Sequence, residues 1–186
     1  MRPWLALALI TSAIACAPTK LVGEVLPGAL APDFTLTEGP TGQTVTLSAL
    51  RGQVVLLTFL YTSCVDVCPL TAETIRGARD RLGNKAGEVV FIAVSVDPVG
   101  DTPATTRRFV QDHGVEGTLR YLIGSQAALA RVWQAYGIAQ AVSTRDVLHS
   151  DAIYLIDKTE RGRVLLHSDV TADDLAGDLG ILLRER

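Results

Sequence analysis

The sequence has no surplus of positive charge, no internal repeat and no low-complexity segment. Its net charge is −3 with a pI of about 5.6, and its lysines and arginines are scattered along the chain, which argues against nucleic-acid binding. Hydrophobic residues make up 48% of the 186 residues, so disorder of the main body is not expected. This length and composition predict one domain of ordinary size once any leader is removed.

The apolar stretch at the N-terminus is too short for a comfortable transmembrane helix, which needs about 20 apolar residues. Arg2 supplies a positive start, residues 4–15 are apolar, and small residues lead into Cys16, a pattern that indicates an export signal. Residues 13–16, Ala-Ile-Ala-Cys, resemble a bacterial lipobox with alanine in place of the usual leucine, which predicts acylation of Cys16. An ordinary signal peptide or an uncleaved anchor is the alternative. We expect the protein to be exported and anchored to the bacterial cell membrane, facing the periplasm or the cell exterior.

Apolar runs and turn residues divide the chain into a leader, a tether and one domain. We expect residues 1–16 to be the signal peptide and lipobox, residues 17–30 a tether, and residues 31–186 the folded domain. The patterns predict the following elements: a hairpin of residues 34–36 and 44–47, strands at 53–60, 88–96 and 119–123, helices at 70–82, 103–113 and 126–136, strands at 152–156 and 164–167 joined by a turn at Gly162, and a helix at 171–184. This order predicts an α/β fold, a thioredoxin-like three-layer sandwich with a mixed central sheet and an extra N-terminal hairpin.

Cysteine is scarce, and its placement is the most informative feature of the chain. Cys64 and Cys68 stand between a predicted buried strand and a predicted helix, and lipidation of Cys16 would leave them as the one pair of thiols in an oxidising compartment. Such a pair can form a disulfide, exchange one, or hold a soft metal ion. The alternative is a pair of unreactive buried cysteines or a plain stabilising disulfide, although a bridge that closes so few residues stabilises little.

The predicted helix start favours ionised sulfur. A helix N-terminus carries a partial positive charge, which makes a thiol there easier to ionise. Pro69 suits the first helical turn and so places Cys68 near the cap. A carboxylate that lay beside the two thiolates would repel them, so we expect Asp66 to cap the helix instead.

Proline is absent from the whole chain after Pro103. Oxidoreductases of the thioredoxin fold carry a cis-proline before the strand that faces the cysteines, whereas this sequence has His149 at about that place. Two thiolates and one imidazole suit Cu(I), with Cu(II) as a further possibility, while a closed zinc site normally has four protein ligands. A surface or capping role is the alternative for His149. His113 and His167 are expected to be structural.

A second compact motif follows the second buried strand. Residues 97–103, Asp-Pro-Val-Gly-Asp-Thr-Pro, lie at the edge of the predicted sheet where sites usually form. A turn followed by a helix cap at Thr102 explains the same residues equally well.

Together these motifs resemble the Sco/SenC family, which comprises copper-binding assembly factors for cytochrome c oxidase with a thioredoxin-like fold. The resemblance covers the chain from about Ala31 to its C-terminus and rests on the segments 59–69, 95–103 and 149–157. It implies a copper site of Cys64, Cys68 and His149 outside the cytoplasmic membrane. The implied partner is the oxidase subunit that carries the dinuclear copper centre, with another copper chaperone as a further candidate.

One residue departs from the family pattern. Val65 follows the first cysteine, where the family usually has proline. Valine leaves the turn less rigid and keeps its backbone N–H, so the departure bears on geometry and redox tuning without removing a ligand.

Three functions compete for the cysteine pair. The leading prediction is a copper metallochaperone rather than an enzyme, and the second is a thiol–disulfide reductase that keeps the copper-site cysteines of the oxidase reduced, using the cysteines as a redox-active pair. A peroxidase of the peroxiredoxin type is disfavoured, because Leu57 and Tyr61 occupy the positions of its proline and threonine.

Overall fold

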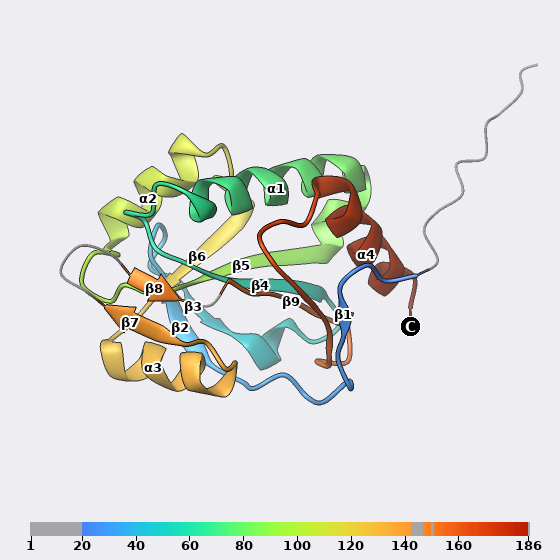
Figure 1. Cartoon of the computed structure of the whole chain (residues 1–186), viewed down its shortest axis with the longest axis horizontal. Helices are drawn as coiled ribbons and strands as arrows, with labels where there is room; N and C mark the ends of the chain where they lie inside the picture. The colour runs from blue at the N-terminus through green and yellow to red at the C-terminus, as the bar shows by residue number, and fades with distance from the viewer. Residues whose placement is uncertain (1–19, 143–146, 150, 186) are drawn as a thin grey trace, which may run out of the picture.

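A mixed eight-stranded sheet forms the centre of the protein (Figure 1). The computed structural model describes residues 20–142, 147–149 and 151–185. In spatial order the strands are β1 (Glu24–Val25), β10 (Gly162–Leu166), β9 (Ile153–Ile156), β4 (Val54–Leu60), β5 (Val89–Ser95), β6 (Leu119–Ile123), β2 (Thr35–Glu38) and β3 (Thr44–Thr46). Strands β4, β5 and β6 are parallel to one another, and the remaining pairs are antiparallel.

Helices cover both faces of this sheet. Figure 1 shows α1 (Val67–Leu82) and α4 (Ala172–Arg184) on one face, with α2 (Pro103–Asp112) beside α1 and α3 (Gln126–Ala135) on the opposite face. Two 3₁₀ helices, η1 (Leu47–Leu50) and η2 (Gly83–Glu88), and a separate pair of strands, β7 (Gln140–Val142) and β8 (Val147–His149), complete the described elements. The predicted three-layer thioredoxin-like sandwich with its N-terminal hairpin is confirmed.

Strand β4 shows why the sequence folds in this way. All seven of its residues are buried, because it lies in the middle of the sheet with a parallel neighbour on one side and an antiparallel neighbour on the other. An unbroken apolar run is what a strand covered on both faces requires. Its one polar side chain, Thr58, donates a hydrogen bond of 3.0 Å to the carbonyl of Ala152, so burial leaves no unpaired hydroxyl.

Residues 22–31, most of which fall in the predicted tether, lie against the domain. Strand β1 pairs with β10, and the buried carboxylate of Asp178 in α4 accepts hydrogen bonds from the backbone of Val22 and Gly23. Gly23 permits this approach, since a Cβ there would lie 2.4 Å from a methyl carbon of Val164. These contacts join residues far apart in the sequence, which local patterns do not reveal.

Two further details of the C-terminal half differ from expectation. Gly162 is the first residue of β10, and the turn before it runs through residues 157–161, with Glu160 at a φ of 66°. Strands β7 and β8 were not predicted, because each has only three residues.

The leader and Cys16 lie outside the described residues. Within the part of the chain that the structure describes, no helix is both long and apolar enough to cross a membrane.

Candidate metal centre

The cysteine turn leaves the C-terminal end of β4 and enters α1. Cys64 is 8% exposed and Cys68 is fully buried, and both are free thiols. A hydrogen bond of 3.3 Å from the Cys64 N–H to the carbonyl of Tyr61 closes the turn. The two sulfurs therefore sit together under the surface at the edge of the sheet.

Sulfur takes the place of the expected capping carboxylate at the start of α1. The helix begins at Val67, and Asp66 occupies the N-cap without making a side-chain cap hydrogen bond. Its φ and ψ of −124° and −91° differ from the extended conformation that directs a capping side chain. The backbone N–H of Cys68 donates to Sγ of Cys64 instead, at 3.3 Å. The prediction that Asp66 caps the helix is thus wrong, and Cys68 lies in the first turn with Pro69 rather than at the cap.

The pKa values of the two thiols are shifted in opposite directions. A hydrogen bond from the Cys68 thiol, opposed by burial, lowers the pKa of Cys64 to about 5, with further help from backbone N–H groups and the Tyr61 hydroxyl. The pKa of Cys68 is raised far above its ordinary value, because this thiol gives its hydrogen bond to Cys64, is buried, and lies near negative charge. The pair therefore loses one proton readily and retains the second, so it carries one negative charge near neutral pH.

A buried carboxylate joins the cysteine turn to the next loop. Oδ1 of Asp101 accepts a hydrogen bond of 2.8 Å from the N–H of Thr62, and Oδ2 accepts from the hydroxyls of Ser95 at 2.7 Å and Tyr121 at 3.1 Å. Burial raises the pKa of Asp101 in spite of these three donors. The sequence placed Asp101 only in a loop at the sheet edge, since an aspartate between glycine and a capping threonine looks like a turn residue.

The loop that contains Asp101 is itself well ordered by local hydrogen bonds. Oδ1 of Asp97 accepts from the N–H groups of Val99 at 3.1 Å and Gly100 at 2.9 Å, which forms an Asx turn. Thr102 and Thr105 form a capping box at the start of α2. The expectation of a turn followed by a helix cap is therefore confirmed, and the bond between Asp101 and Thr62 adds a connection to the cysteine turn.

His149 is the last residue of β8, where its backbone pairs with that of Gln140. Strand β9 is antiparallel to β4, with Ile153 opposite Thr58, so the chain that enters β9 comes from the edge of the sheet where the cysteine turn begins. The topology thus brings the backbone near His149 to this edge. The side chain of His149 lies outside what the structure describes.

The other two histidines have structural contacts. The ring of His113 packs against Phe109 with centroids 4.5 Å apart, at the C-cap of α2. Nδ1 of His167 lies 2.6 Å from the carbonyl oxygen of Asp151. Among the described side chains, no group of three or more His, Cys, Asp and Glu is arranged to hold a metal ion, so the described part of the site consists of the two sulfurs.

Comparisons of the sequence with known proteins identify a family and its members. The SCO1/SenC family model matches residues 24–184. The bovine mitochondrial SCO2 homolog is 34% identical over 132 residues, which make up 67% of this chain and 48% of that protein, so the chain spans about half of that relative's length.

Two solved structures with copper bound share the fold. ScoI of Bradyrhizobium japonicum is 33% identical with a TM-score of 0.74, and the match covers 83% of this chain and 99% of that one. ScoI of Arabidopsis thaliana is 26% identical with a TM-score of 0.72, and the match covers 83% of this chain and 96% of that one.

Proposed function

The chain belongs to the SCO1/SenC family, and from this premise we propose that it binds copper and delivers it during assembly of the copper centre of cytochrome c oxidase. The observation that carries the proposal is the pair of buried free thiols at the start of α1, where the N–H of Cys68 donates to Sγ of Cys64 at 3.3 Å. Two such sulfurs suit a soft cation, because thiolate sulfur favours Cu(I). The two related ScoI proteins whose structures contain copper support the choice of metal.

We assign the copper ligands to Cys64, Cys68 and His149. The two cysteines are four residues apart, and the N–H of Cys68 donates to Sγ of Cys64 at 3.3 Å, which supports the two sulfurs as ligands of one ion. His149 ends a strand whose continuation reaches the same edge of the sheet. Three ligands of this kind suit Cu(I) better than a closed zinc site, which needs a fourth.

A copper titration of the His149→Ala variant tests this assignment. The variant should keep both thiols while its Cu(I) affinity in competition with a chelator falls by more than the 10–100-fold typical of residues that only support a ligand. The control is His113→Ala, which removes a histidine packed on Phe109 and should leave the affinity unchanged. An unchanged affinity in His149→Ala would remove this residue from the site.

Thiol–disulfide exchange is the second candidate function, and the low pKa of Cys64 favours it. A thiolate is the attacking species in exchange, and a pKa of about 5 keeps Cys64 ionised at neutral pH. Reduction of an oxidised peptide from the oxidase subunit needs only the two cysteines, so it should survive in His149→Ala. If exchange collapsed in this variant while copper binding persisted, the reductase would replace the chaperone as the proposed function.

Copper binding should depend on the redox state of the pair. A disulfide between Cys64 and Cys68 removes both thiolates, so the oxidised domain should bind Cu(I) far more weakly than the reduced domain. Equal affinities measured for the two forms would contradict the ligand assignment.

We also propose that a lipid on Cys16 anchors the domain to the outer face of the bacterial cell membrane. The lipobox-like sequence of the leader supports this. A multiply acylated N-terminus anchors stably, whereas a single chain binds only marginally. Two measurements test this anchor: membrane fractionation of Cys16→Ser and the intact mass of the wild-type protein. The proposal is refuted if the variant stays in the membrane fraction and the wild-type mass shows no lipid.

A further inference from the structure

Large exposed apolar side chains gather beside the buried thiols. Val65, between the two cysteines, is 95% exposed; Val99, in the loop after β5, is 86% exposed; and Leu70, in α1, is 53% exposed. The other large exposed apolar residues of the described chain are Val22, Val25 and Leu30, all in the N-terminal segment. Scattered exposed valines are ordinary, but apolar groups that concentrate around a functional site indicate a surface that another molecule covers.

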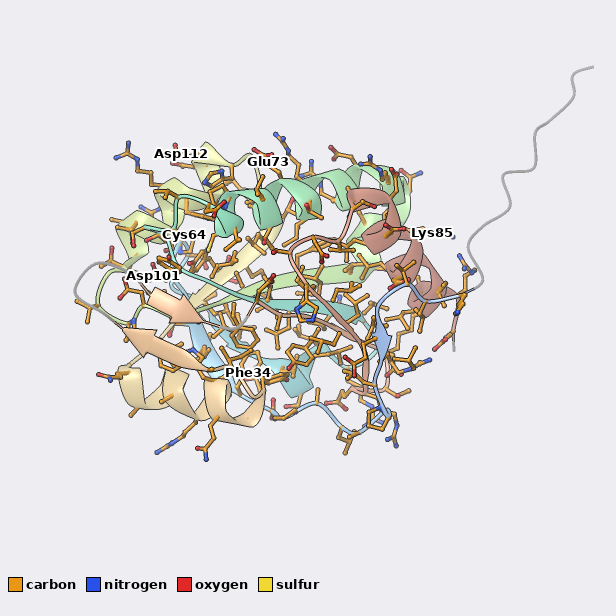
Figure 2. The ribbon with its side chains drawn as sticks, in the orientation of Figure 1. Phe34, Cys64, Glu73, Lys85, Asp101 and Asp112 are labelled. Carbon is orange, nitrogen blue, oxygen red and sulfur yellow. The ribbon has the colours of Figure 1, made fainter. Side chains whose placement is uncertain are left out.

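The two loops that carry Val65 and Val99 are held side by side. Strands β4 and β5 are parallel neighbours that end together, with Leu60 opposite Ser95. Beyond that pair, the N–H of Thr62 donates to Asp101 at 2.8 Å, which joins the two loops. Figure 2 shows Cys64 and Asp101 at the same end of the molecule, where α1 begins. We call residues 62–70 and 97–102 the thiol rim.

The thiol rim presents Val99 on a rigid support. The Asx turn at Asp97 fixes the backbone N–H groups of Val99 and Gly100. A Cβ at position 100 would lie 2.2 Å from Oδ2 of Asp97, so glycine lets the carboxylate sit close against the loop. An apolar group that is already ordered costs little entropy when a partner covers it.

The charge of the thiol rim favours a partner with positive charge. The acidic residues that the rim presents are Asp66, which is exposed, and Asp97, which is half-buried; Asp101 is buried beneath them, and the rim has no lysine or arginine. Of the two arginines of α2, Arg108 pairs with Asp112, and Arg107 points to the carbonyl of Pro40, to which it donates a hydrogen bond. An apolar surface with acidic groups is complementary to an apolar segment with basic groups.

We infer that the thiol rim is the docking surface for an apolar, positively charged protein segment that carries its own cysteine ligands, an inference that rests on the proposed delivery of copper. Cys64 is 8% exposed and Cys68 is buried, so an acceptor has to seat on the rim before it reaches the metal. The ion passes as Cu(I) without electron transfer. The bonds from the ion to the two donor sulfurs and to His149 break as two bonds to acceptor sulfurs form, and the protons released by the acceptor thiols pass to the donor thiolates or to water.

The test compares two synthetic acceptor peptides with the same pair of cysteines and the same leucines. One peptide has flanking lysines and the other has flanking glutamates. Stopped-flow measurement with the Cu(I)-loaded domain should show transfer to the lysine peptide about tenfold faster at low salt, and the difference should shrink as salt is added. Because Asp66 is the exposed charge next to Val65, Asp66→Asn should reduce this ratio.

Matched variants separate docking from copper binding. Because Val65 lies between the two proposed ligands, Cu(I) transfer from Val65→Ser/Val99→Ser to dithiothreitol, a small uncharged acceptor that needs no docking surface, serves as the reference for any change at the copper site itself. Relative to that reference, transfer from this variant to the lysine peptide should be about tenfold slower than from the wild type, which corresponds to about 1.4 kcal/mol. The control is Val22→Ser/Val25→Ser, which removes two valines of similar exposure, 61% and 63%, from the N-terminal segment and should transfer copper normally.

Several results would overturn the inference. Equal rates for the two peptides, or a Val65→Ser/Val99→Ser variant that matches the control, would show that the rim does not recognise this partner. Binding of the wild type but not this variant to phosphatidylcholine vesicles, with unchanged peptide rates, would assign the rim to a membrane. A wild-type domain that binds no Cu(I) would instead refute the proposed function, and the inference with it.

Discussion

Replacement of Asp101 by alanine should destabilise the domain and loosen the cysteine turn. The carboxylate accepts three hydrogen bonds, from the backbone of Thr62 and from the hydroxyls of Ser95 and Tyr121, and both hydroxyl-bearing residues are fully buried. A hydrogen bond to a charged group contributes about 1.5–3 kcal/mol, and an unsatisfied buried donor costs about 1–3 kcal/mol. Rotation of the hydroxyls and recovery of the desolvation energy of the carboxylate offset part of this sum.

We therefore expect Asp101→Ala to lower the free energy of unfolding by about 3 kcal/mol, or the melting temperature by about 6–12 °C for a domain of this size. The control Asp112→Ala removes an exposed surface partner of Arg108 and should cost about 0.5 kcal/mol. Denaturant unfolding of the reduced domain measures both. Since Thr62 also loses its partner, Cu(I) affinity should fall in Asp101→Ala and remain unchanged in the control. Equal stability of the two variants would refute the proposed role of the buried carboxylate.

The pH dependence of stability gives an independent check on Asp101. Burial raises its pKa, so the native carboxyl holds its proton more tightly than the unfolded one. The resulting stabilisation is fully present below the unfolded pKa of about 4 and is lost as pH rises through the raised native pKa. Asp101→Asn lacks this titration, so the stability of the wild type relative to the variant should decline with rising pH across that window. A relative stability that is constant, or that rises with pH, would contradict the argument.

Three further predictions concern the thiols and the N-terminal segment. The rate of alkylation of Cys64 in the reduced apo domain, followed by mass spectrometry, should rise with pH with a midpoint near pH 5. In Cys68→Ala the midpoint should shift to higher pH, because the thiol of Cys68 supplies the main hydrogen bond that stabilises the Cys64 thiolate. An unchanged midpoint would disprove that cause. Gly23→Ala should destabilise the domain by about 1–3 kcal/mol, because its Cβ would meet β10, whereas Gly87→Ala meets nothing within 4 Å and should be nearly neutral in thermal unfolding. Asp178→Ala should accelerate amide hydrogen exchange in residues 22–25, because its carboxylate accepts hydrogen bonds from the backbone N–H groups of Val22 and Gly23, while α1 should stay protected. Unaltered exchange would show that the pairing of β1 alone holds the segment.

The sequence alone determined the order of the main helices and strands, because each of these has a local signature, whereas β1, β7 and β8 have none. An unbroken apolar run marked β4, a capping threonine with proline marked α2, and the placement of Cys64 and Cys68 marked the junction of strand and helix. These signals depend on side-chain period and on backbone preferences within a few residues, which any reader of the sequence can see. The copper expected from the two thiols and His149 is also the metal that the related ScoI structures contain.

Only the tertiary structure decided how the site is tuned. The burial of Asp101 depends on β5 and β6, which place Ser95 and Tyr121 against it. The backbone conformation at Asp66 leaves the cap of α1 to the sulfur of Cys64. The hydrogen bond between the two thiols, together with burial, moves their pKa values apart. Hydrogen bonding, desolvation and charge at a buried group come from neighbours that are remote in the sequence, so the folded chain sets these properties and the local pattern does not.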